Sequence, residues 1–298
     1  MAKTAAEVVG EWEARGYRLA VEGGSVWAID LPATDPAAGD PIFVLHGFPS
    51  CSFDWRDVIE PMRGGRRVVL FDFLGFGLSD KPDYRYSINK YADTAESVAA
   101  ACGLEHVVLV THDMGDSVGG ELLARDLDGK LGFDVTARVI TNGSIYLEMA
   151  HLTNGQQALL GADDERLDLA ALGLDPEPGF KAGLAETFAV APDPVELDAQ
   201  WLLLSRERGH TVLTRTIRYI EDRRAEEARY TGAIEKHSSP VDIVWGELYP
   251  VAVHDMALRL KAARPDATLT TLDGVGHYPM IEDPTRFAAA VGASIAER

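Results

Sequence analysis

Residues 107–123, VVLVTHDMGDSVGGELL, are the stretch from which the fold of this chain is inferred. The first five residues are an apolar, β-branched run of the kind found in buried parallel strands. From Val118 onward, apolar side chains recur at helical spacing. Asp113 stands in the polar turn between them, two residues before Gly115. A strand that turns sharply into a helix here would lift the Asp113 side chain above the sheet edge, as in a nucleophile elbow. The alternative is an ordinary strand-to-helix turn whose aspartate caps the helix.

Composition predicts one large, acidic α/β domain. The chain has 298 residues, of which 46% are hydrophobic, and 28 Lys+Arg against 47 Asp+Glu give a net charge of −19. This charge disfavours nucleic acid and anionic membranes as partners. Two cysteines make no disulfide framework, and no signal peptide or membrane-spanning run is evident, so we predict a cytoplasmic protein. The histidines lack metal-ligand spacing. We therefore predict no metal. We also predict no cofactor, a small-molecule substrate, and a monomer or homodimer.

Strands and helices alternate along most of the chain, which predicts a mostly parallel eight-stranded sheet flanked by helices. The alternation stops at residues 149–236, where the pattern is helical and broken by Gly and Pro. We interpret this segment as a helical cap inserted after strand six, between core residues 1–148 and 237–298. Strands are predicted at residues 16–21, 25–31, 42–45, 67–71, 107–111, 137–141, 241–246 and 267–272, and helices at 4–15, 52–62, 87–102, 253–263 and 284–296.

Several motifs accompany the elbow: His46-Gly47-Phe48-Pro49, a glycine-rich loop at residues 72–82, Gly276-His277-Tyr278-Pro279 and Glu282-Asp283-Pro284. Together with Asp113 they resemble the α/β-hydrolase superfamily, in its cap-bearing branch of epoxide hydrolases and haloalkane dehalogenases. Within this branch the chain looks most like the mesoderm-specific-transcript proteins and their bacterial relatives.

The resemblance implies a two-step mechanism. Asp113 would attack an sp³ carbon and form an alkyl ester. His277, on the loop after the last strand, would deprotonate the water that hydrolyses this ester. The backbone N–H groups of Phe48 and Met114 would form the oxyanion hole, while His46 would brace its loop.

In the relatives, an acidic residue completes a catalytic triad with the nucleophile and the histidine. The sequence departs from this pattern at the acid. Tyr249 occupies the usual acid position in the loop after strand seven, and Asn142 occupies the alternative position after strand six. Glu148 is our preferred substitute, and Glu247 is another. It also remains open that neither carboxylate orients His277.

The substrate-activating groups favour an epoxide. Dehalogenases tend to carry Trp and Asn at the positions of Met114 and Phe48, whereas epoxide hydrolases use cap tyrosines. Tyr219 is the preferred candidate, with Tyr146 or Tyr230 as alternatives. The charged run at residues 221–229 is interpreted as a solvated helix face.

The predicted function is hydrolysis of a small electrophile, preferably an epoxide, through an alkyl-enzyme ester. The alternatives are a haloalkane or haloacid dehalogenase, and a catalytically impaired binding protein with the hydrolase fold, which Tyr249 motivates.

Overall fold

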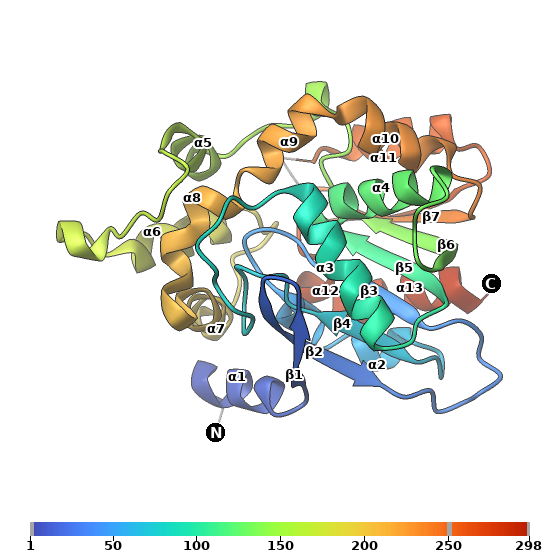
Figure 1. The fold of residues 1–298 in the computed structure, drawn as a ribbon, viewed down its shortest axis with the longest axis horizontal. Coiled ribbons are helices and arrows are strands. Elements are labelled where there is room, and N and C mark those ends of the chain that lie inside the picture. Colours follow the sequence, from blue (N-terminus) through green and yellow to red (C-terminus); the bar gives the residue numbers. More distant parts are fainter. Residues whose placement is uncertain (1–2, 249–251, 297–298) are drawn as a thin grey trace.

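The computed structural model describes residues 3–248 and 252–296. Its eight strands form one sheet in the order β1-β2-β4-β3-β5-β6-β7-β8 (Figure 1). β1 pairs antiparallel with β2, and β2 with β4, while the other neighbours are parallel, which confirms the predicted sheet. The strands are β1 Tyr17–Val21, β2 Gly24–Leu31, β3 Ile42–Leu45, β4 Val68–Phe71, β5 His106–His112, β6 Asp134–Thr141, β7 Val241–Gly246 and β8 Thr268–Leu272.

Helices cover both faces of the sheet, which is why the central strands are apolar throughout. Every residue of β3, β4 and β7 is buried, as expected for parallel strands enclosed on both sides. In Figure 1, α3 lies in front of the sheet and α13 behind it. The helices of the core are α1 Ala5–Glu13, η1 Ser52–Trp55, α2 Ile59–Met62, α3 Ile88–Ala101, α4 Met114–Leu127, α11 His254–Ala263, α12 Pro279–Glu282 and α13 Pro284–Ala296.

Between β6 and β7 the chain forms a series of helices, as the sequence predicts. In Figure 1, α5 to α8 lie to one side of the sheet, and α9 and α10 lead back toward α4. α10 packs closely on α4 at Gly120. A Cβ atom added there would lie 2.9 Å from the carbonyl oxygen of Tyr230. The elements of this segment are η2 Leu147–Met149, α5 Asn154–Gly161, η3 Ala170–Leu172, α6 Pro176–Ala185, α7 Pro194–Ser205, η4 Arg206–Val212, α8 Leu213–Thr216, α9 Tyr219–Ala225 and α10 Glu227–Lys236.

The helix predicted over residues 52–62 is divided in two. The 3-10 helix η1 ends at Trp55, and α2 begins only at Ile59. Pro61 explains the break, because its ring would clash with the carbonyl of residue 57 in a continuous helix. In the observed arrangement Pro61 lies in the first turn of α2, where its missing N–H is tolerated.

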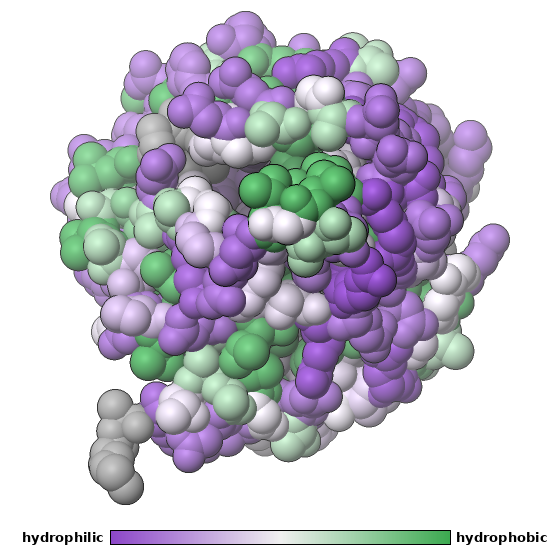
Figure 2. Space-filling view, turned by 90° about the vertical axis from the view of Figure 1, so that its left-hand side faces the viewer, coloured by the Kyte–Doolittle hydropathy of each residue, from purple (hydrophilic) through white to green (hydrophobic). Residues whose placement is uncertain are grey.

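The face formed by the helical segment is mostly hydrophilic. Figure 2 shows hydrophobic side chains in small separate groups among polar ones. The exposed large hydrophobic residues of this segment are Leu172, Leu174, Val190 and Leu202. Within residues 3–248 and 252–296, no helix has both the length and the apolar character needed to cross a membrane.

Candidate active site

Asp113 occupies a strained turn between β5 and α4. Its backbone has φ 53° and ψ −115°, outside the regions that non-glycine residues prefer. Its side chain does not cap α4, so the alternative of an ordinary helix cap is not observed. The turn is tight because α4 starts against β3, where any Cβ at Gly115 would collide with the carbonyl of Leu45. The carboxylate is therefore held at the tip of the turn as a separate functional group.

The loop after β3 supplies a backbone donor to this carboxylate. The N–H of Phe48 donates to Asp113 Oδ1 at 2.8 Å. Gly47 makes the approach possible, because a Cβ there would lie 2.6 Å from Asp113 Cβ. His46 holds the same loop from behind, with Nε2 accepting from the Phe73 N–H at 2.9 Å and Nδ1 2.8 Å from the Gly47 carbonyl oxygen.

Opposing effects set the ionisation of Asp113. Burial raises the pKa of its carboxyl from 3.8 to about 6. The N–H groups of Phe48 and Met114, and then the charge of Arg223, act in the other direction and lower this pKa. Asp113 is thus ionised at neutral pH but less well solvated than a surface carboxylate. Such a group is more nucleophilic than one covered by water.

His277 lies beside Asp113, at the other end of the sequence. Its Nε2 is 3.7 Å from Asp113 Oδ2, and both side chains are buried. Burial holds the pKa of His277 well below its ordinary value of 6.5, and nearby His112, whose ring centroid is 4.6 Å away, lowers it further. A neutral imidazole at this position can accept a proton from water.

Two side chains that the sequence reasoning did not assign hold the His277 loop. The carboxylate of Glu282 accepts from the N–H groups of Gly276 at 3.0 Å and Tyr278 at 3.1 Å. The amide of Asn142 bonds to the Gly246 N–H and carbonyl, and its Nδ2 lies 3.5 Å from the Gly276 carbonyl oxygen. The position of Glu282, five residues after His277 in the last quoted motif, was the available signal for the first of these contacts.

The prediction that Glu148 orients His277 is not supported by its position. Glu148 is exposed and forms an ion pair with Arg259 on the surface. Glu247 is also exposed, and its carboxylate accepts from the N–H of Gly274 at 3.3 Å. Because both carboxylates point to the surface, neither is brought to the buried imidazole. Tyr249 lies outside the described residues.

Two side chains of α9, those of Tyr219 and Arg223, lie close to Asp113 and Phe48. The ring of Tyr219 is buried and its centroid lies 5.8 Å from that of Phe48. Burial and the charge of Asp113 raise the pKa of Tyr219, so its hydroxyl remains a proton donor. Arg223 follows with its guanidinium 5.6 Å from the Tyr219 ring centroid and is only 4% exposed. The interpretation of residues 221–229 as a solvated face is therefore wrong at Arg223.

The alternative tyrosines occupy different environments. Tyr146 donates from its hydroxyl to Glu235 at 2.8 Å and stacks under Arg259, beside the exposed Glu148. Tyr230 is buried in α10, and the charge of Glu121 contributes to its raised pKa. Only the pKa of Tyr219, among these three, is raised by the charge of Asp113.

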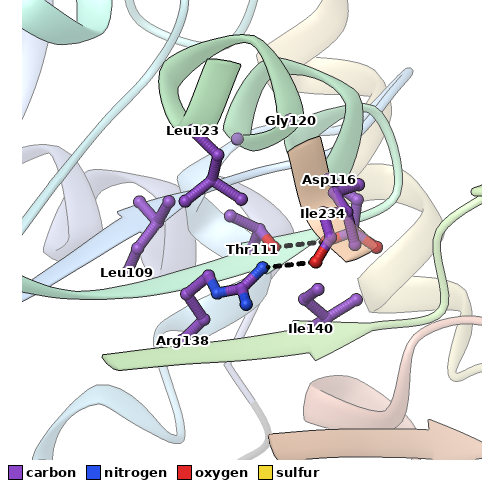
Figure 3. Close-up of a pocket in the computed structure, with 9 residues that line it drawn as sticks. Leu109, Thr111, Asp116, Gly120, Leu123, Arg138, Ile140 and Ile234 are labelled. Atoms are coloured by element: carbon purple, nitrogen blue, oxygen red, sulfur yellow. Dashed lines mark hydrogen bonds between the residues drawn. The ribbon is translucent and has the colours of Figure 1, made fainter. Parts of the chain in front are cut away.

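The second aspartate of the elbow stretch has a different environment. Asp116 accepts from the Thr111 hydroxyl beneath the elbow, a hydrogen bond drawn as a dashed line in Figure 3, while Arg138 in the same view donates to the Ile234 carbonyl. The cavity there is about 10 Å³, which is room for about one water molecule and for no substrate. Burial holds the pKa of Asp116 well above its ordinary value, and the charge of Asp113 adds to this rise. The protonated form of Asp116 is therefore favoured by its surroundings, which leaves Asp113 as the carboxylate at the tip of the elbow.

No group of three or more His, Cys, Asp or Glu side chains, among those that the structure describes, is arranged to hold a metal ion. The described residues bring together a carboxylate, an imidazole, a phenol, a guanidinium and two backbone donors.

A strained elbow, a backbone donor loop and a late histidine on a doubly covered parallel sheet define an α/β hydrolase. Residues 42–290 match the alpha/beta hydrolase family, and the chain belongs to this family. Similar proteins include LipZ of Mycobacterium tuberculosis, 40% identical over 95% of this chain and 96% of LipZ. The mesoderm-specific transcript protein of Mus musculus is 33% identical over 84% of this chain and 76% of its own length.

Solved structures with this fold include enzymes of both predicted types. The epoxide hydrolase CorEH has a TM-score of 0.76 and 17% identity, over 95% of this chain and 98% of CorEH. The haloalkane dehalogenase DatA of Agrobacterium tumefaciens has a TM-score of 0.74 and 18% identity, over 95% of this chain and 96% of DatA. At these identities the likeness establishes the fold, and the substrate has to be argued from the site.

Proposed function

We propose that this hydrolase opens small epoxides and hydrolyses the resulting alkyl-enzyme ester to a diol. The observation that carries the proposal is the two-sided arrangement of the Asp113 carboxylate. Oδ1 faces the N–H of Phe48 at 2.8 Å, and Oδ2 faces His277. One oxygen is thus held as a future ester carbonyl, and the other is directed toward the reacting carbon.

In the first half-reaction, Asp113 Oδ2 attacks a ring carbon of the epoxide. A new C–O bond forms to the carboxylate while the ring C–O bond breaks, and the ring oxygen leaves as an alkoxide. The Tyr219 hydroxyl donates its proton to this oxygen. The raised pKa keeps this phenol protonated at neutral pH, and an alkoxide, which is more basic than a phenolate, can take its proton.

In the second half-reaction, water attacks the ester carbonyl carbon of Asp113. His277 takes one proton from this water, and the N–H groups of Phe48 and Met114 stabilise the oxyanion on Oδ1. Collapse of the tetrahedral intermediate releases the diol and regenerates the carboxylate. The proton on His277 returns to the Tyr219 phenolate, so the sum is epoxide plus water to diol.

An epoxide is favoured over an alkyl halide because of the groups that meet the leaving atom. A halide leaves without a proton and needs N–H donors from side chains. Met114 and Phe48 present only backbone N–H groups, and these face Asp113. Tyr219 instead offers a proton, which an epoxide oxygen requires.

Intact-mass spectrometry tests the proposal. Wild type and His277→Gln are exposed to glycidamide and to 1-bromobutane, and any adduct is located by peptide mapping. We expect an ester on Asp113 that persists in His277→Gln with glycidamide, while wild type releases the diol. An adduct only with the bromide would support the dehalogenase alternative. No adduct with either electrophile, together with no turnover, would contradict the proposal and favour a binding protein.

A further inference from the structure

Arg223 is a buried cation on the side of α9 that faces the nucleophile. It follows Tyr219 by four residues, so both side chains extend from the same face of the helix. Its side chain is 4% exposed. Its neighbour Arg224, on the other face, is exposed.

Other buried arginines of this protein donate several hydrogen bonds to protein acceptors, although Nε of Arg138 has no partner in the described part of the chain. Arg138 donates to the carbonyls of Ile234 and Ser239 at 2.9 and 3.0 Å. Arg218 and Arg264 likewise donate to backbone carbonyls and to a neighbouring carboxylate. These guanidinium groups serve the fold, because each replaces lost water with protein acceptors.

Arg223 differs from them. Of the residues that the structure describes, none accepts a hydrogen bond from Arg223 or forms an ion pair with it, and its Nε is buried without a partner. Its guanidinium lies over the Tyr219 ring, whose centroid is 5.6 Å from the guanidinium carbon. An unpaired buried charge is costly, and proteins keep one chiefly where function requires it.

The positive charge of Arg223 affects the pKa values of the reacting groups, although the guanidinium does not contact Asp113. It lowers the pKa of both Asp113 and Tyr219, yet the two charged groups are not within ion-pair distance. The donors of the guanidinium are therefore available to a ligand that lies next to Asp113.

We propose that Arg223 binds a carboxylate on the substrate, so that the preferred substrates are small epoxides bearing a carboxylate, such as glycidate. This inference rests on the proposed function. The planar guanidinium fork matches the two oxygens of a carboxylate, and one positive charge balances one negative charge. The bound acid would present its ring to Asp113 and Tyr219, and its hydrolysis would consume one water and yield a dihydroxy acid.

Binding of unreactive analogues tests Arg223 independently of catalysis. Cyclopropanecarboxylate has a methylene group in place of the ring oxygen of glycidate, and cyclopropanecarboxamide is its neutral counterpart. Calorimetry on wild type should give at least a tenfold lower Kd for the carboxylate. Arg223→Gln should abolish this preference, Arg223→Lys should keep part of it, and Arg224→Gln, the matched control, should keep all of it. Equal affinity for both analogues, or a preference unchanged in Arg223→Gln, would overturn the inference.

Turnover then separates the two proposals. Glycidate should be hydrolysed with at least a tenfold higher kcat/KM than glycidamide, and Arg223→Gln should remove the difference mainly through KM. Carboxylate binding at Arg223 without turnover of any epoxide would sustain this inference and refute the proposed function. Equal losses for glycidate and glycidamide in Arg223→Gln would mean that Arg223 serves only Asp113, and would refute this inference alone. The melting temperature of Arg223→Gln should not be lower than that of wild type, because the substitution removes an unpaired buried charge.

Discussion

Nε2 of His277 lies 3.7 Å from Oδ2 of Asp113, although 164 residues separate them in the chain. This distance is too long for a strong hydrogen bond, so the imidazole does not occupy the carboxylate oxygen. The two groups can therefore act in turn, Asp113 on the substrate carbon and His277 on the water that follows.

Adding one methyl group at Gly47 should displace the nucleophile. A Cβ there would lie 2.6 Å from Asp113 Cβ, so Gly47→Ala must push the carboxylate away from the Phe48 N–H. Because misplacing a reacting group by about 1 Å costs roughly 10²-fold, we expect kcat to fall by about that factor. Gly10→Ala is the control, since nothing lies within 4 Å of its Cβ. Wild-type turnover in Gly47→Ala would show that the close approach is unimportant.

The pH dependence of ester formation should report the ionisation of Asp113. Burial raises the pKa of this carboxyl to about 6, and only the ionised form attacks. In His277→Gln, where the ester accumulates, its rate of formation should be constant above pH 7 and fall about tenfold per unit well below pH 6. Rapid-quench mass spectrometry measures this rate. A rate that is flat between pH 5 and 8 would contradict the assignment.

Removing the charge of Asp113 should stabilise the fold. Because the folded pKa of about 6 exceeds the ordinary 3.8, the protonated form is favoured in the folded state, and stability is lost as pH rises through this interval. Asp113→Asn should thus gain up to about 3 kcal/mol of unfolding free energy at pH 8, and much less at pH 4. Urea unfolding measures both values. Exposed Asp273→Asn is the control, and equal gains in the two variants would refute the argument.

Loss of the Tyr219 hydroxyl should slow epoxide opening specifically. Without a proton donor at the ring oxygen, Tyr219→Phe should reduce the rate of ester formation by roughly 10²-fold or more. Tyr146→Phe is the matched control, because that hydroxyl is bound to Glu235. If both variants lose activity equally, the proton comes from elsewhere.

Neutralising Glu148 should leave turnover within about twofold of wild type. Its carboxylate is exposed and paired with Arg259, and charges at such sites contribute little to a buried centre. Steady-state kinetics of Glu148→Gln measures the effect. A large loss of kcat, with an ester accumulating on Asp113, would restore Glu148 as the acid that orients His277.

The sequence predicted the fold well because its signals are local. Runs such as residues 42–45 are apolar throughout, and the glycines at 47 and 115 mark close approaches, to the Asp113 side chain and to the backbone of Leu45 respectively. The break at Pro61 was also readable in principle, because proline excludes the continuous helix that was predicted.

The side-chain partners of the site were less predictable. Glu148 and Glu282 are both acidic residues near core loops, and only the packing places one in solvent and the other on three backbone N–H groups. Arg223 lies in a run of charges whose composition indicates a surface, yet one turn of α9 buries it. Such outcomes depend on which face of a helix meets another element, and spacing alone does not specify this.

The contacts of Glu282 also connect the histidine loop to the helical segment. Besides Gly276 and Tyr278, Glu282 accepts from the Ala189 N–H at 2.9 Å, and the His277 N–H donates to the Thr187 carbonyl at 3.1 Å. Thr187 and Ala189 lie between α6 and α7, so the His277 loop is anchored partly to the helical segment. Swinging this part of the cap aside would draw His277 away from Asp113. In the proposed mechanism, this shared anchoring would couple the position of residues 187–189 to the hydrolytic step, which needs His277 beside Asp113.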